Sequence, residues 1–166
     1  MNATMQEAMN GQLNSELYSS YLYLSMSAFF ESKEHKGMAN WMRVQAQEEL
    51  AHAIRFFDFI NGSGGLVVLT SVDAPPTKWA SPQAVYEHVL AHERKVTGLI
   101  NGLVTLADRE NDRRAHEFLQ WFVKEQEEEE ESAEGALGKV RAAGDDPKAL
   151  KAVDSELGKR VFHPPK

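Results

Sequence analysis

The stretch Gln47-Glu48-Glu49-Leu50-Ala51-His52 decides how this chain must fold. Glu49 and His52 stand three residues apart, so on a helix their side chains point the same way and could share one ion. They also belong to a stripe that recurs every three or four residues, the spacing of a core-facing helical surface: Met38, Met42, Gln45, Glu49, His52, Phe56 and Phe59. A buried carboxylate without compensation is costly, so the rest of the chain must supply charged partners or keep it neutral.

Length and composition narrow the class of protein. The chain has 166 residues, a net charge of −7 and a sequence pI of about 5.4, which predict one acidic domain spanning 1–166. The acidic balance argues against nucleic acid or an anionic membrane as a partner. Without cysteine there is no disulfide framework or thiol chemistry. With no secretory signal and no apolar run of roughly 20 residues, we expect a soluble, cytoplasmic protein.

Proline and glycine divide the sequence into helical segments. Ser81-Pro82 is typical of a helix start, with proline at the first helical position. Gly37 is interpreted as the stop of the first helix. The pattern predicts helices at about 5–34, 38–61, 82–109, 112–143 and 147–158.

Residues 62–81 predict a long crossover between the second and third helices. A twenty-residue connection can reach ~60 Å, more than the ~40 Å length of a 28-residue helix. It would therefore return the chain to the other end of the bundle and leave those two helices parallel. A β-hairpin on a separate subdomain is the alternative, because Leu66-Val67-Val68-Leu69-Thr70 is strand-like. We expect an all-α four-helix bundle with a short fifth C-terminal helix.

Each long helix carries polar, metal-competent residues on its core stripe. They are Glu16 on the first helix, Glu49 and His52 on the second, Glu93 on the third, and Gln126 and Glu129 on the fourth. Counting ~1.5 Å per residue, all of them fall in the central third of a ~42 Å bundle. Four buried carboxylates would repel one another strongly without a cation. One imidazole with several carboxylates favours a hard or borderline ion: iron for redox chemistry, with manganese and zinc also compatible.

With these residues in view, the chain resembles the non-haem ferritins of bacteria and archaea, members of the ferritin-like di-iron carboxylate family. The resemblance extends from Leu13 through the fifth helix. Its most specific pieces are Tyr21-Leu22-Tyr23-Leu24-Ser25-Met26, Asn40-Trp41-Met42 before Gln47–His52, and Phe118-Leu119-Gln120-Trp121-Phe122-Val123-Lys124-Glu125-Gln126.

The resemblance implies specific iron ligands. One iron would be held by Glu16, Glu49 and His52. Glu49 would bridge to a second iron, held by Glu93 and Glu129 with Gln126 close by. The bacterial and archaeal type has a third iron position, which here would use Glu48, Glu125, Glu128 and Glu129.

Two further groups of residues have a bland interpretation beside the functional one. Tyr23 and Trp121 match aromatic residues beside the di-iron centre, although core packing explains them equally well. Because successive helical residues turn by about 100°, only part of the acidic run 127–131 can face one site. We expect Glu129 to point inward, Glu128 to lie on the inner edge, and the others to be solvated.

The family resemblance implies iron storage with ferroxidase activity. Dioxygen or peroxide would oxidise Fe(II), and the Fe(III) mineral would lie inside a homo-oligomeric shell of 24 subunits. Haem is not expected, because Leu50 stands where bacterioferritins carry their haem-ligating methionine. Two alternatives remain: another di-metal carboxylate enzyme, such as an oxidase or a catalase, and a catalytically silent bundle whose polar core residues pair with one another.

Overall fold

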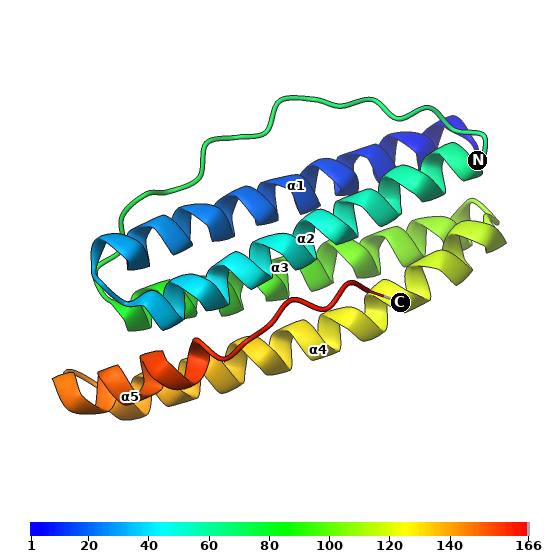
Figure 1. Cartoon of the computed structure of the whole chain (residues 1–166). Helices are drawn as coiled ribbons and strands as arrows, with labels where there is room; N and C mark the ends of the chain where they lie inside the picture. The colour runs from blue at the N-terminus through cyan, green and yellow to red at the C-terminus, as the bar shows by residue number, and fades with distance from the viewer. Residues whose placement is uncertain (166) are drawn as a thin grey trace.

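Four long helices form a bundle, and a short fifth helix closes one end of it (Figure 1). The computed structural model describes residues 1–165, in which we find no β-strand. This confirms the predicted fold class. None of the helices in this part of the chain is long and apolar enough to cross a membrane. The helices are α1 Ala3–Ser32, α2 Lys36–Gly62, α3 Pro82–Arg109, α4 Arg113–Ala143 and α5 Pro147–Leu157.

The crossover between α2 and α3 runs along the outside of α1 for most of the bundle's length (Figure 1). Polar side chains of α1 hold it: Gln6 Oε1 accepts from Leu66 N at 2.8 Å, and Asn10 Oδ1 accepts from Val68 N at 2.8 Å. Further along, Ser25 Oγ donates to the carbonyl of Pro76 at 2.6 Å. These hydrogen bonds to side chains take the place of strand pairing. Residues 62–81 contain no β-strand, so the β-hairpin alternative is wrong. α2 and α3 consequently run parallel.

The same spacing of three or four residues predicts a core stripe on each long helix. On α3 and α4 every predicted member is buried: Tyr86, Val89, Glu93, Val96, Ile100, Leu103 and Ala107, then Ala115, Leu119, Phe122, Gln126, Glu129, Ala133, Ala136 and Val140. The stripe predicted on α1 is Met9, Leu13, Glu16, Ser20, Tyr23, Ser27 and Phe30. On α1 and α2 one position each differs from the expectation. Ser20 and Phe59 are only half-buried, because their neighbours Ser19 and Ile60 face the core instead. A 4-3 spacing drifts slowly around a straight helix, since 3.6 residues make one turn.

The apolar core has two parts with a gap between them. One cluster includes Met26, Phe30 and Met42, and the other includes Met9, Phe56 and Phe122. Each cluster takes side chains from all four long helices. The gap lies at the middle of every helix, where the polar members of the stripes occur.

Gly37 lies in the first turn of α2 and does not end α1, so its predicted role is wrong. The reversal is made by Glu34, whose φ is 61°. Gly37 is needed for close packing: an added Cβ would lie 1.7 Å from the carbonyl oxygen of Asp154 in α5. The Asp154 carboxylate caps α2 from across the interface, accepting from Gly37 N at 3.1 Å and Met38 N at 2.8 Å.

We predict that Gly37→Ala displaces α5 and lowers the free energy of unfolding by about 1–3 kcal/mol, because the new methyl group overlaps backbone that cannot move alone. Chemical denaturation measures the loss. Gly135→Ala is the matched control, since nothing lies within 4 Å of its added Cβ, and it should be neutral or slightly stabilising. Equal stability of the two variants would contradict the close-packing role of Gly37.

Candidate metal centre

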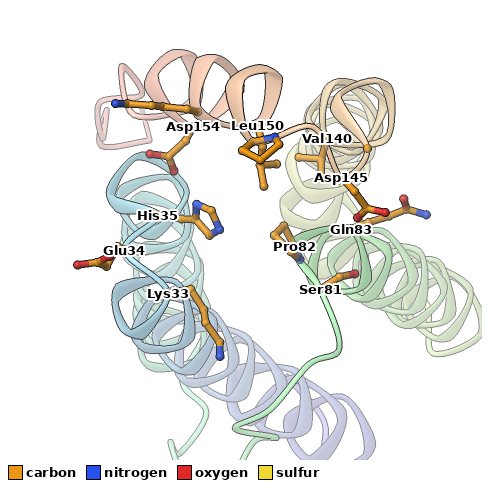
Figure 2. A pocket seen from close by; sticks show the side chains of 13 residues that line it. Lys33, Glu34, His35, Ser81, Pro82, Gln83, Val140, Asp145, Leu150 and Asp154 are labelled. Atoms are coloured by element: carbon orange, nitrogen blue, oxygen red, sulfur yellow. The ribbon is translucent and has the colours of Figure 1, made fainter.

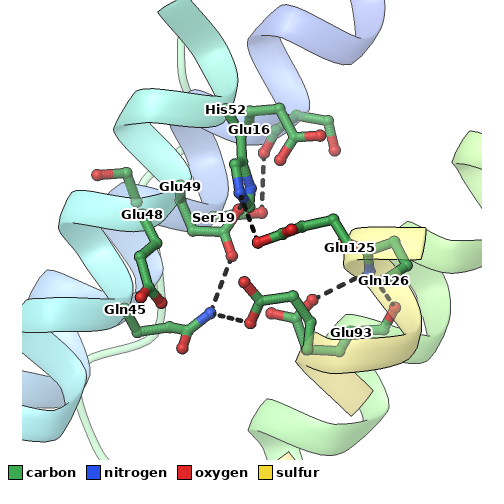
Figure 3. Close-up of polar contacts among 12 residues, drawn as sticks. Glu16, Ser19, Gln45, Glu48, Glu49, His52, Glu93, Glu125 and Gln126 are labelled. Atoms are coloured by element: carbon green, nitrogen blue, oxygen red, sulfur yellow. Dashed lines mark hydrogen bonds and ion pairs between the residues drawn. The ribbon is translucent and has the colours of Figure 1, made fainter. Parts of the chain in front are cut away.

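The six metal-competent stripe residues form one buried layer between the two apolar clusters (Figure 3). None of them is more than 5% exposed. They come from four helices whose registers are set by the crossover and the two tight helix–helix turns. The layer is made of these side chains: Glu16, Glu49, His52, Glu93, Gln126 and Glu129.

In the layer and at its edge, ligand-type atoms gather in three groups, each with all its atoms within 4.8 Å of one another. The first group is Glu16, Glu49 and His52. The second is Glu49, Glu93 and Glu129, so Glu49 belongs to both. We call these two together the inner groups. Two neighbouring positions that share one carboxylate are the geometry of a bridged metal pair.

The third group, here called the outer group, consists of His52, Glu125 and Glu129. His52 lies between the inner and outer groups: its Nδ1 is 3.4 Å from Glu49 Oε2, and its Nε2 is 3.6 Å from Glu125 Oε1. Glu125 is partly exposed, with a side chain 25% accessible. The outer group thus connects the buried layer to the surface.

Two other residues expected at the third position do not join the outer group. Glu48 pairs with Arg160 of the C-terminal tail. Glu128 is exposed, so its expected place on the inner edge is wrong. At 100° per residue, Glu129 and Glu125 occupy the inward face of α4 and turn Glu128 outward.

Three glutamine amides organise the carboxylates. Gln45 Nε2 bridges two helices, donating to Glu49 at 3.1 Å and to Glu129 at 2.6 Å. Gln126 Nε2 donates to a carboxylate oxygen of Glu93 at 3.2 Å. These bonds hold the carboxylates in position before any ion arrives.

The sequence patterns predict no function for two of these donors, Gln12 and Gln45. Gln45 stands one turn before Glu49 on the same stripe, and Gln12 stands one turn before Glu16, to which it donates at 2.7 Å. A glutamine four residues before a buried carboxylate predicts a hydrogen bond between them, because the two side chains are neighbours on a helix.

Two buried atoms in the first group have no hydrogen-bond partner among the described residues. They are Glu16 Oε2 and His52 Nδ1, and the latter has only the 3.4 Å ion-pair approach to Glu49 Oε2. Buried polar atoms are rarely left unpaired, because each costs roughly 1–3 kcal/mol. An oxygen and a nitrogen left open beside the Glu49 carboxylate fit the ligand set of a metal ion.

Four residues of the layer have pKa values raised above their ordinary values. Burial raises the pKa of Glu93 to about 7, against hydrogen bonds from Tyr23 and Gln126 that lower it. Burial and the Glu93 charge raise the pKa of Glu129 to about 7. The same two causes raise the pKa of Glu49 well above its usual range. Burial alone would lower the pKa of His52, but contacts with Glu125 and Glu49 raise it well above its usual value.

Two aromatic side chains flank the layer. The hydroxyl of Tyr23 donates to Glu93 Oε1. The ring of Trp121 contacts His52 edge to face, with centroids 5.6 Å apart, and carries Arg55 3.9 Å above its own centroid. Tyr23 is fully buried and Trp121 half-buried. Each aromatic side chain contacts a metal-competent residue, Tyr23 to Glu93 and Trp121 to His52, which core packing alone does not require.

A surface pocket of about 530 Å³ lies at the end of the bundle that carries the α1–α2 turn, between the start of α3 and α5 (Figure 2). Its lining mixes both signs of charge, from Lys33 and Lys151 to Asp145 and Asp154. None of the layer's residues lines it. The chemistry of the chain is concentrated in the buried layer.

The whole bundle has relatives among known proteins. Residues 6–143 match the family model of the ferritin-like domain. A bacterial non-heme ferritin of Bacteroides fragilis is 44% identical over 156 residues, covering 94% of this chain and 97% of the relative. A bacterial non-heme ferritin of Escherichia coli is 37% identical, covering 92% and 93%. The open-pore ferritin of Archaeoglobus fulgidus superposes with a TM-score of 0.96 at 50% identity, covering 97% and 98%.

We predict that the metal-free protein loses stability as the pH rises from about 4.5 to about 7. Glu93 and Glu129 bind protons more tightly in the folded than in the unfolded chain, so their protonation favours folding. That contribution is complete below their ordinary pKa of 4.5 and is lost through about 7, amounting to ~3 kcal/mol per carboxylate. Urea unfolding across this range, with metal removed, measures it.

Glu93→Gln should flatten this pH profile, since the amide does not titrate. The control is Glu127→Gln on the exposed face of α4, which should keep the wild-type slope. A metal-free protein whose stability rises between pH 5 and pH 7 would contradict the burial of these charges.

Proposed function

This chain belongs to the ferritin-like domain family, and we propose that it is a non-haem ferritin that oxidises Fe(II) and stores the Fe(III) product. Iron is then both substrate and cargo. The oxidation would occur at the inner groups, and the mineral would lie within a shell of subunits. A cytoplasmic location stays a prediction from the sequence.

The observation that carries this proposal is the sharing of Glu49 between the two inner groups. Two irons bound on either side of one carboxylate can be oxidised together. Each Fe(II) gives up one electron, and dioxygen takes both with two protons to become hydrogen peroxide. Alternatively, hydrogen peroxide takes both electrons with two protons to become two water molecules. A paired site is suited to both oxidants because each accepts two electrons.

The protein's own groups contribute binding and charge. We propose Glu16, Glu49 and His52 as ligands of the first iron, and Glu49, Glu93 and Glu129 as ligands of the second. Carboxylates with pKa values near 7 are partly protonated in the empty site, so iron binding releases protons. The negative charge left behind then favours the oxidised ion, because Fe(III) carries one more positive charge than Fe(II).

Neighbouring residues support this assignment in two ways. Gln126 and Gln45 donate to the carboxylates and hold them against mutual repulsion. We propose that Tyr23 tunes the second iron through its bond to Glu93 and that Trp121 shields His52 from water. The outer group would take a third iron, using His52, Glu125 and Glu129.

Subunit association is the second half of the storage proposal. α2 turns an apolar row outward: Leu50 and Ile54 are 47% and 50% exposed, and Phe57 is 39% exposed. Exposed apolar residues on α1 and on the crossover add to it, among them Tyr21, Leu24, Leu66 and Leu69. So much clustered apolar surface is typical of an interface. We propose that a second copy of this chain covers it, as one contact of a 24-subunit shell.

We predict that Glu49→Gln and His52→Ala each slow aerobic Fe(II) oxidation ~100-fold, because Glu49 belongs to both inner positions and His52 to the first. The rise of Fe(III) absorbance after mixing Fe(II) with the protein measures the rate. Glu127→Gln, which removes an exposed carboxylate from the same acidic run, should oxidise iron at the wild-type rate.

Retained iron separates storage from the other functions. Wild type should hold many irons per subunit after repeated additions. Wild-type oxidation rates in both site variants would rule out the proposed centre. Oxidation with only two or three irons retained per subunit would instead favour a di-metal oxidase or catalase.

We predict that Ile54→Arg dissociates the assembly, because it puts a charge in the centre of the apolar row. Light scattering after size-exclusion chromatography gives the particle mass, and helical content by circular dichroism confirms folding. The control is Lys139→Arg on α4, which keeps the charge of an exposed side chain. An assembly of unchanged mass would show that another surface joins the subunits.

A further inference from the structure

The segment that follows α5 turns back along the bundle toward its middle (Figure 1). Its backbone is attached to α2 by one side chain, since Asn40 Nδ2 donates to the carbonyls of Gly158 at 3.2 Å and Arg160 at 2.9 Å. Gly158 and Gly37 lack side chains, so the backbone of the segment can lie directly against the backbone of α2. Arg160 is thereby brought over α2.

The side chain of Arg160 is held by Trp41 and Glu48. Its guanidinium carbon lies 4.3 Å from the ring centroid of Trp41, a distance typical of a cation–π contact. Nη1 donates to the Trp41 carbonyl at 3.5 Å, and Nη2 pairs with Glu48 Oε2. The side chains of Arg160 and Glu48 are only 20% and 21% exposed, so water screens the pair weakly.

Glu48 belongs electrostatically to the outer group. The charges of Glu129, His52 and Glu125, which are the outer group's three members, all act on it. The positive charge of Arg160 acts on Glu48 and also on Glu129. Arg160 thus supplies a cation at the edge of a cluster that gathers three carboxylates around one imidazole.

We propose that Arg160 is a tethered cation that competes with a metal ion for the outer position. The inference rests on the proposed function, because it concerns the third of its iron positions. Glu48, which the family resemblance assigns to the third iron, can join the three outer-group residues only by giving up its pair with Arg160. The two cations also repel each other. An ion that fills the outer position therefore releases Arg160, and with it the segment from 158 to 165.

The inner positions do not share this competition. The inner groups lie in the layer of residues no more than 5% exposed, and Arg160 makes no hydrogen bond or ion pair with any of their members in the described structure. Arg160 therefore lowers the affinity of the outer position more than that of the inner positions, which its charge reaches only through Glu129. The outer position then fills after the inner pair.

Calorimetric titration of the metal-free assembly with Zn²⁺ tests the proposal without redox chemistry. Wild type should bind two ions per subunit tightly and a third more weakly. Arg160→Gln should strengthen the third step about tenfold, equivalent to ~1.4 kcal/mol, and change the first two much less. The matched control is Arg141→Gln, which removes the same charge from an exposed pair with Glu87 and should change no step.

A double variant and an unmodified protein complete the test. In Glu48→Gln with Arg160→Gln the tenfold gain should disappear, because Arg160 acts through Glu48. In wild type, hydrogen exchange of residues 158–165 should accelerate when the third ion binds and not when the first two bind. This second measurement does not depend on how well the variants fold.

The outcomes separate the two proposals. Two tight steps in wild type, with a third step equal in wild type and Arg160→Gln, would overturn the role of Arg160 and leave the proposed function standing. Unchanged exchange of residues 158–165 at the third step would overturn it as well. Absence of the two tight steps would contradict the proposed function and this inference together.

Discussion

The structure depends on burying four carboxylates and an imidazole at one level of a helical bundle. The layer stands between two apolar clusters, and each cluster draws side chains from all four long helices. The apolar clusters stabilise the bundle, while the layer works against it, since charges taken out of water raise the energy of the folded state. Amide donors such as Gln45 and Gln126 offset part of that cost. A bound cation would offset the rest, which couples folding to metal.

The crossover sets the direction of α3. Because it returns the chain along α1, α3 runs parallel to α2, and Glu93 comes level with Glu49. A short turn would have made α3 antiparallel to α2 and, since Glu93 is the twelfth of the 28 residues of α3, shifted it by ~8 Å along the bundle. The side chains of Gln6, Asn10 and Ser25 hold the crossover against α1, so a segment without regular structure has a defined path.

Much of the fold, and the set of residues in the inner groups, could be predicted from helical periodicity, whereas the grouping of these residues around two irons came from the family resemblance. The stripes of α3 and α4 were right throughout, and on α1 and α2 the errors were single residues, where a 4-3 spacing drifts. Gly37 has a role that its local sequence pattern does not predict. A glycine near a helix end has the same local signature as a stop, whereas its actual role is to admit α5, whose position is set by contacts more than 100 residues away in the chain.

The sequence by itself determined which residues face the core, the class of their chemistry and the level at which they meet, because helix geometry converts residue spacing into direction and height. Only the tertiary structure decided which residues surround the inner groups. It turned Glu128 outward and brought Arg160 to Glu48. The physical reason is that an ion pair across two helices depends on their separation and on where the tail lies, and neither quantity is written in the periodicity of a single helix.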